Sequence, residues 1–97
     1  MIKHIIIWNL KDGIDKDSVK AEIKKQLEGL VGKIEGLLEM NIITSGLPSS
    51  TGDLMMDSTF ESADALKFYA SHPAHVAVAD GIVRPNTMSR AAYDYEV

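Results

Sequence analysis

The first apolar stretch of the chain, residues 2–10, carries bulky side chains on both faces of the strand that it is expected to form. Its sequence, IKHIIIWNL, is rich in β-branched residues and runs into the turn-forming segment KDG, which indicates a strand followed by a stop. Side chains alternate across a strand, so Ile5 and Ile7 point away from the face formed by Ile2, His4, Ile6, Trp8 and Leu10. One layer of helices covers only one face of a sheet, so the second face needs another partner.

The segment after this strand has the periodicity of an amphipathic helix. Apolar residues recur at helical spacing over residues 16 to about 33, and most of the charged residues fall on the other side. Asp15 stands where a helix N-cap is expected, and Gly32 and Gly36 mark the exit from the helix. The buried stripe is predicted to comprise Val19, Ile23, Leu27, Leu30, Val31 and Ile34.

The middle of the chain predicts two strands joined by an exposed loop. Residues 37–44, LLEMNIIT, return to strand composition, and residues 53–60, DLMMDSTF, predict a third strand. The intervening SGLPSSTGD is dense in Ser, Gly and Pro, as is typical of a loop or hairpin connection.

A second helical region follows and is expected to be broken in two. Ser62 is a good N-cap, and Pro73 should end the first helix and begin another, because proline is well tolerated at the first helical position. The apolar segment that Pro73 opens is expected to stay helical until Pro85. The inner stripe of the first helix is predicted to comprise Ala63, Leu66, Tyr69 and Ala70.

The final strand is predicted over residues 88–97. Ala91, Tyr93 and Tyr95 share one of its faces, while Arg90 and Asp94 are expected on a solvated face. The element order is therefore βαββαβ, which is the split-βαβ pattern. It predicts an α+β, ferredoxin-like fold in which helices cover one face of a four-stranded antiparallel sheet.

The apolar second face of this sheet predicts a homodimer. An antiparallel sheet with one solvated face should alternate cleanly between apolar and polar residues, and residues 2–10 do not. The expected cover is the sheet of a second copy, since two-fold dimers are the commonest oligomers. With 97 residues, the chain is expected to form a single domain, 1–97, with one core.

Composition excludes several classes of partner. The chain is 45% hydrophobic and 25% charged, which is ordinary for a water-soluble globular domain. A net charge of −4 without a basic cluster disfavours nucleic acid and anionic membranes as partners. No signal peptide, membrane span or cysteine is evident, and we expect a cytoplasmic protein without a cofactor.

Two of the three histidines bracket Pro73 in the segment YASHPAHVAV. His72 precedes the proline, where a role in capping the next helix is favoured over ligand contact. His75 falls in the first turn of that helix, where the helix dipole should lower its pKa and keep it neutral, as a general base requires. The alternative for His75 is a structural role, and a metal site formed with His4 and His72 is disfavoured in the absence of cysteine.

Three stretches resemble the stress-responsive A/B barrel family, often abbreviated Dabb: IKHIIIWNLKDGID, TFESADALKFYASHPAHVAVADGIVRP and YDYEV. The resemblance implies a dimeric α+β barrel in which two ferredoxin-like sheets close on each other. Members of the family include polyketide cyclases that act in a cavity between sheet and helices. The resemblance also implies that His75 is a catalytic base, that Tyr69 is its phenolic partner, and that His4 forms a polar wall of the same pocket.

Taken together, these features predict a homodimer that binds a small apolar or aromatic molecule between its sheet and its helices. Tyr69 and His75 are the candidate catalytic residues, and His4, Trp8 and His72 are the candidate ligand contacts. A non-catalytic binding or stress-protective role is one reading. The other is a cofactor-independent lyase, similar to a polyketide cyclase, in which His75 removes a proton and Tyr69 donates one.

Overall fold

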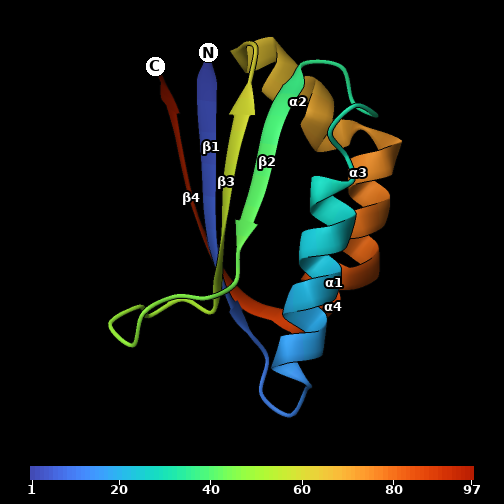
Figure 1. The fold of residues 1–97 in the computed structure, drawn as a ribbon. Helices are drawn as coiled ribbons and strands as arrows, with labels where there is room; N and C mark the ends of the chain where they lie inside the picture. Colours follow the sequence, from blue (N-terminus) through green and yellow to red (C-terminus); the bar gives the residue numbers. More distant parts are fainter.

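The structure, a computed structural model, describes residues 1–97 and has the predicted order of strands and helices (Figure 1). Residues 73–86 form one continuous helical stretch that leads into the last strand. The elements are β1 (Ile2–Leu10), α1 (Lys16–Glu28), β2 (Leu37–Ile43), β3 (Leu54–Phe60), α2 (Ala63–Ser71), α3 (Pro73–Val78), η1 (Ala79–Val83), α4 (Arg84–Asn86) and β4 (Thr87–Glu96).

The four strands form one antiparallel sheet in the order β2-β3-β1-β4. All helices lie on one face of this sheet, and the long loop between β2 and β3 extends away from them (Figure 1). The predicted ferredoxin-like βαββαβ fold is therefore confirmed. None of the helices combines the length and the apolar composition that crossing a membrane requires.

The alternation predicted for β1 is confirmed. Ile6, Trp8 and Leu10 are buried beneath the helices, whereas Ile7 on the opposite face is 42% exposed. The strand register places further apolar side chains beside Ile7 on that uncovered face. We call this the outer sheet face, and its apolar members are Ile5, Ile7, Ile43, Met55, Ala91, Tyr93 and Tyr95.

The predicted helix caps are also confirmed. The Asp15 carboxylate accepts a hydrogen bond from the Ser18 N–H at 3.2 Å and so begins α1. The Ser62 hydroxyl accepts one from the Ala65 N–H at 3.1 Å and begins α2. Both side chains satisfy backbone donors that the first turn of a helix leaves free.

α1 is shorter than its apolar periodicity predicts: it ends at Glu28, whereas the periodicity runs to about residue 33. Leu30 and Ile34 are still buried, but they lie in a series of turns that follows the helix. Gly36 then leads into β2 with a φ of 87°, which favours glycine. A Cβ at Gly36 would also lie 2.6 Å from the Cβ of Ala65, so α2 approaches this turn too closely for another residue.

The sequence suggested that the helical region after Pro73 ends at Pro85, but in the structure it does not. It continues through Asn86, because η1 is a π-helical segment and Pro85 lies in the first turn of α4, where its missing N–H is tolerated. The stripe predicted for α2 is partly wrong as well. Tyr69 is buried and Leu66 half-buried, but Ala63 and Ala70 are exposed, and Ala65 packs against the core instead.

Candidate functional site

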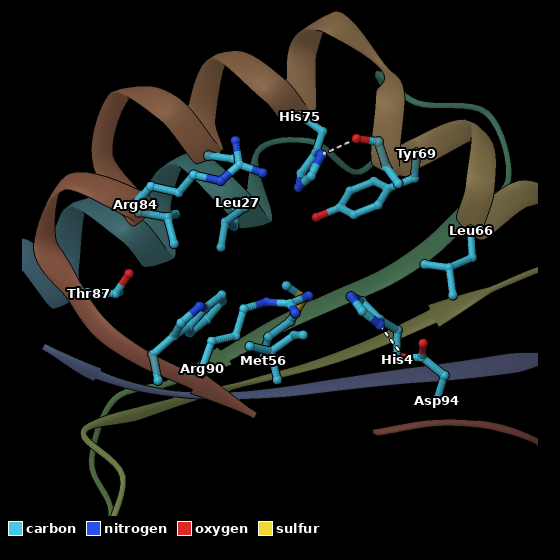
Figure 2. A pocket seen from close by; sticks show the side chains of 15 residues that line it. His4, Leu27, Met56, Leu66, Tyr69, His75, Arg84, Thr87, Arg90 and Asp94 are labelled. Carbon is cyan, nitrogen blue, oxygen red and sulfur yellow. Dashed lines mark hydrogen bonds and ion pairs between the residues drawn. The ribbon is translucent and has the colours of Figure 1, made fainter. Parts of the chain in front are cut away.

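A cavity of about 550 Å³ lies between the sheet and the helical stretch that runs from α2 to α4 (Figure 2). β4 is exposed along nearly its whole length, so the helices leave a space above β1 and β4. The volume is in the range of small-molecule sites. The cavity is lined by the apolar residues Ile6, Trp8, Leu27, Met56, Leu66, Ala70, Ala79 and Val83 and by the polar residues His4, Tyr69, His75, Arg84, Thr87, Arg90 and Asp94.

Tyr69 and His75 meet on the helical side of the cavity. The chain turns at Pro73, and this break brings the Tyr69 ring of α2 against the His75 ring of α3, with ring centroids 4.1 Å apart. Tyr69 is also held from behind by Phe60 of β3, at a centroid distance of 4.9 Å. The two residues that the family resemblance singles out are therefore adjacent and line one cavity.

His75 is held as a neutral imidazole with one nitrogen free. Its Nδ1 lies 3.1 Å from the carbonyl oxygen of Ala70, which only accepts, so Nδ1–H is the donor and Nε2 is left with its lone pair. Figure 2 shows Nε2 turned toward the cavity. Burial lowers the His75 pKa, the Ala70 bond raises it, and the positive charges of Arg84 and Arg90 lower it further.

The direction of the His75 pKa shift is thus the predicted one, but burial is its principal cause, where the sequence pointed to the helix N-terminus. At neutral pH a group whose pKa is below 6.5 is mostly unprotonated. His75 therefore has the protonation state and the orientation that accepting a proton requires.

The Tyr69 hydroxyl is buried and has no hydrogen-bond partner within the protein. Burial raises its pKa well above the usual value, so the hydroxyl stays protonated and remains a donor. Buried polar groups are nearly always paired, and leaving one unpaired is costly. An unpaired donor in the wall of a cavity is therefore an observation that points to an acceptor supplied from outside the chain.

His4 faces this pair from the floor of the cavity and is oriented by Asp94. The two residues are direct cross-strand neighbours on β1 and β4, and His4 Nδ1 is hydrogen-bonded to the Asp94 carboxylate. The carboxylate fixes Nδ1 as the donor, which leaves Nε2 available on the cavity side. His4 is 8% exposed, and its ring packs edge-on against Phe60.

Arg90 and Asp94 are both exposed, as the sequence predicted, but the face of β4 that carries them is the one below the helices. Both line the cavity, because the register pairs Arg90 with Trp8 and Asp94 with His4, whose side chains point toward the helices. Arg84 of α4 is a third polar lining residue that the sequence did not single out. It forms an ion pair with Asp80 one helical turn earlier. The two residues are four positions apart on one strand, so their side chains point to the same face of the sheet. This spacing is the feature of the sequence from which their common location could have been predicted.

Of the other two predicted ligand contacts, Trp8 lines the cavity and His72 does not. Trp8 is 4% exposed and lines the cavity, as proposed. His72 does not line it: its Nδ1 accepts a hydrogen bond from the Ala74 N–H at 3.0 Å, and its ring packs against Phe68. The capping role predicted for His72 is therefore confirmed. The three histidines do not converge, and no group of three His, Cys, Asp or Glu side chains is placed to hold a metal ion.

Comparison with known proteins gives consistent matches. The family model for the stress responsive A/B barrel domain matches residues 2–97. A stress-response A/B barrel domain-containing protein of Arabidopsis thaliana is 33% identical over 84 residues, which cover 80% of this chain and 73% of that protein. An uncharacterised protein of Streptomyces coelicolor is 37% identical over 81 residues, covering 79% of this chain and 81% of its own.

Solved structures agree with these matches. A dimeric protein of unknown function with a ferredoxin-like fold from Bacteroides fragilis superposes with a TM-score of 0.90 at 33% identity. The match covers 99% of this chain and 95% of that one. The fold is therefore that of a known group of proteins.

Proposed function

Because the chain belongs to the stress responsive A/B barrel domain family, we propose that it is a homodimer that binds a small, largely apolar or aromatic molecule in its cavity. The observation that carries the proposal is the Tyr69 hydroxyl, a buried donor without a partner in a cavity whose lining is more than half apolar. A ligand with an acceptor oxygen at that point satisfies the hydroxyl, and its apolar body replaces water against Leu27, Met56 and Leu66.

The outer sheet face supports the homodimer. Four of its apolar side chains are 40–71% exposed in the single chain: Ile7, Ile43, Tyr93 and Tyr95. Lys3 and Asp57 on this face neutralise each other, with the Lys3 ammonium 2.6 Å from the Asp57 carboxylate, and Glu39 is the charge left without an ion pair. A largely apolar face with one ion pair already formed is suited to burial against a second copy. The related Bacteroides fragilis protein is itself described as dimeric.

Binding is tested with the single tryptophan of the chain as the reporter. Trp8 lines the cavity, so a molecule that enters it changes the fluorescence of Trp8. We expect 2-tetralone, a bicyclic ketone with one acceptor oxygen, to saturate this signal. Tyr69→Phe should weaken the binding about tenfold, because the donor to the ketone oxygen is lost. Tyr93→Phe, on the outer sheet face, is the matched control and should bind as the wild type does. Equal binding by both variants contradicts the proposed role of the hydroxyl.

A second candidate function is enzymatic, and the orientation of His75 favours it. Nε2 accepts a proton from a carbon beside a carbonyl, and the electron pair of the broken C–H bond moves onto the carbonyl oxygen as an enolate. The Tyr69 hydroxyl donates a hydrogen bond to that oxygen as its charge develops. The enolate carbon then attacks a second carbonyl of the same molecule or expels a leaving group. This is the lyase chemistry of a polyketide cyclase.

Proton transfer can be tested before the natural substrate is known. We expect the protein to accelerate hydrogen–deuterium exchange at the α-carbon of 2-tetralone in D₂O, followed by NMR. His75→Ala should abolish the acceleration while the ketone still binds, and His72→Ala, outside the cavity, should retain it. Binding without any accelerated exchange would leave the non-catalytic binding function and remove the enzymatic one.

A further inference from the structure

Both arginines of the chain line the cavity, whereas none of its lysines does. The protein carries a net charge of −4, so two arginines in one cavity are a local exception. The charged lining residues are Arg84, Arg90 and Asp94, and the charge of Arg84 is offset by Asp80.

The two arginines differ in whether their charge is already used. Arg84 forms an ion pair with Asp80, one turn earlier on the same helical stretch. Arg90 forms no ion pair within 4.0 Å. Asp94 lies four residues further along the same face of β4, so the two Cα atoms are roughly 13 Å apart, and the Asp94 carboxylate is hydrogen-bonded to His4. The Arg90 guanidinium is thus the free cation of the cavity.

Arg90 is placed to act together with Tyr69. Figure 2 shows its side chain extending along the floor of the cavity, beside Met56 and toward His4, below the rings of Tyr69 and His75. Burial raises the Tyr69 pKa and lowers the His75 pKa, and the nearby positive charge of Arg90 opposes the first shift and adds to the second. A guanidinium and an unpaired phenolic donor that share one cavity call for the same kind of partner, an oxygen anion with more than one lone pair.

We propose that the cavity selects small organic carboxylates, with Arg90 binding the carboxylate group and the apolar walls binding the rest of the molecule. The proposal rests on the proposed binding function and narrows it from apolar or aromatic molecules to their acids. A carboxylate offers a guanidinium two coplanar oxygens and still has lone pairs for the Tyr69 hydroxyl. A neutral ligand of the same shape would leave the charge of Arg90 without a partner.

The experiment compares 2-naphthoate with 2-naphthamide, which have the same shape and differ in charge, by isothermal titration calorimetry at pH 7. We expect the wild type to prefer the acid by about tenfold to a hundredfold, as is usual for a hydrogen bond to a charged group. Arg90→Gln should abolish this preference by weakening only the acid, and Arg90→Lys should restore part of it.

The control for lost charge is Lys67→Gln, an exposed residue of α2 that does not line the cavity, and it should keep the full preference. Equal binding of acid and amide by the wild type overturns the proposal but leaves the binding function standing. A preference that survives Arg90→Gln, with circular dichroism showing a folded variant, overturns the role of Arg90. Binding of neither probe contradicts the proposal and the binding function together.

Discussion

The Tyr69 hydroxyl makes the free protein less stable than its packing allows, because it is buried without a hydrogen-bond partner. We predict that Tyr69→Phe leaves the free energy of unfolding unchanged or raises it by up to about 1 kcal/mol, since the ring keeps its contacts with Phe60 and His75. Urea unfolding without ligand measures the change. A loss of more than about 1 kcal/mol would mean that the hydroxyl is bonded within the fold.

The His75 side chain should titrate below pH 6.5, because burial disfavours its charged form. The folded state then binds a proton less readily than the unfolded state does. The stability that the neutral ring contributes is complete above pH 6.5 and is lost as the pH falls toward the folded-state pKa. NMR of the imidazole protons gives the pKa. Urea unfolding at pH 7.5 and 5.5 should show a larger loss for the wild type than for His75→Gln.

A His75 pKa above its ordinary value would contradict this assignment and remove His75 as a base. His72 supplies the comparison, because its ring caps α3 and lies outside the cavity. His72→Ala should therefore cost about 0.5–2 kcal/mol of stability, as the loss of a helix cap does, without weakening a ligand of the cavity.

At the residue scale the sequence predicted the helical wall of the cavity and, with His4 and Trp8, part of the sheet wall, but it missed Arg90 and Asp94. Tyr69 and His75 are six positions apart around a proline, so the motif alone brings them together. Arg90 and Asp94 reach the cavity only through the pairing of β4 with β1, two strands at opposite ends of the chain. No local pattern fixes that register, and a charged residue on an edge strand is ordinarily solvated.

The starts of the helices are determined by single side chains, and this can be measured. We predict that Asp15→Ala lowers stability by about 0.5–2 kcal/mol, because α1 loses the acceptor for the Ser18 N–H. Pro73→Ala should cost less, since the first position of α3 needs no N–H donor and alanine is helical there. Urea unfolding of both variants compares them directly. The opposite order would show that the proline break, rather than the cap, limits helix stability.

At the element scale the starts of the helices and the break at Pro73 were predictable, whereas the end of α1 and the end of the last helical stretch were not. A cap is a local signal, whereas the end of α1 depends on turns that keep Leu30 and Ile34 buried after the helix has stopped. The π-helical geometry of η1 was equally hidden. No residue type distinguishes a π-helical segment from an α-helical one, although the residues at its two ends, Ala79 and Val83, both line the cavity.

At the scale of the whole molecule, the outer sheet face should hold two copies together. We predict that Ile7→Lys gives monomers, because a lysine there places an unpaired charge in the dimer contact. Val31→Lys is a matched control, since Val31 is also 42% exposed but lies in the turns after α1. Size-exclusion chromatography with light scattering at micromolar concentration measures the assembly. A monomeric wild type, or a dimeric Ile7→Lys variant, contradicts the proposed interface.

The position of β4 at the border of the sheet has a consequence for aggregation. One side of this ten-residue strand pairs with β1, and the other presents free N–H and C=O groups that could recruit a strand from another molecule. Inward-pointing charges are a known protection against such edge pairing, and Arg90 and Asp94 occupy those positions. The charged side chains proposed for the ligand site therefore also protect the edge of the sheet. A variant that neutralises both is expected to bind the ligand less well and, in addition, to form fibres more readily.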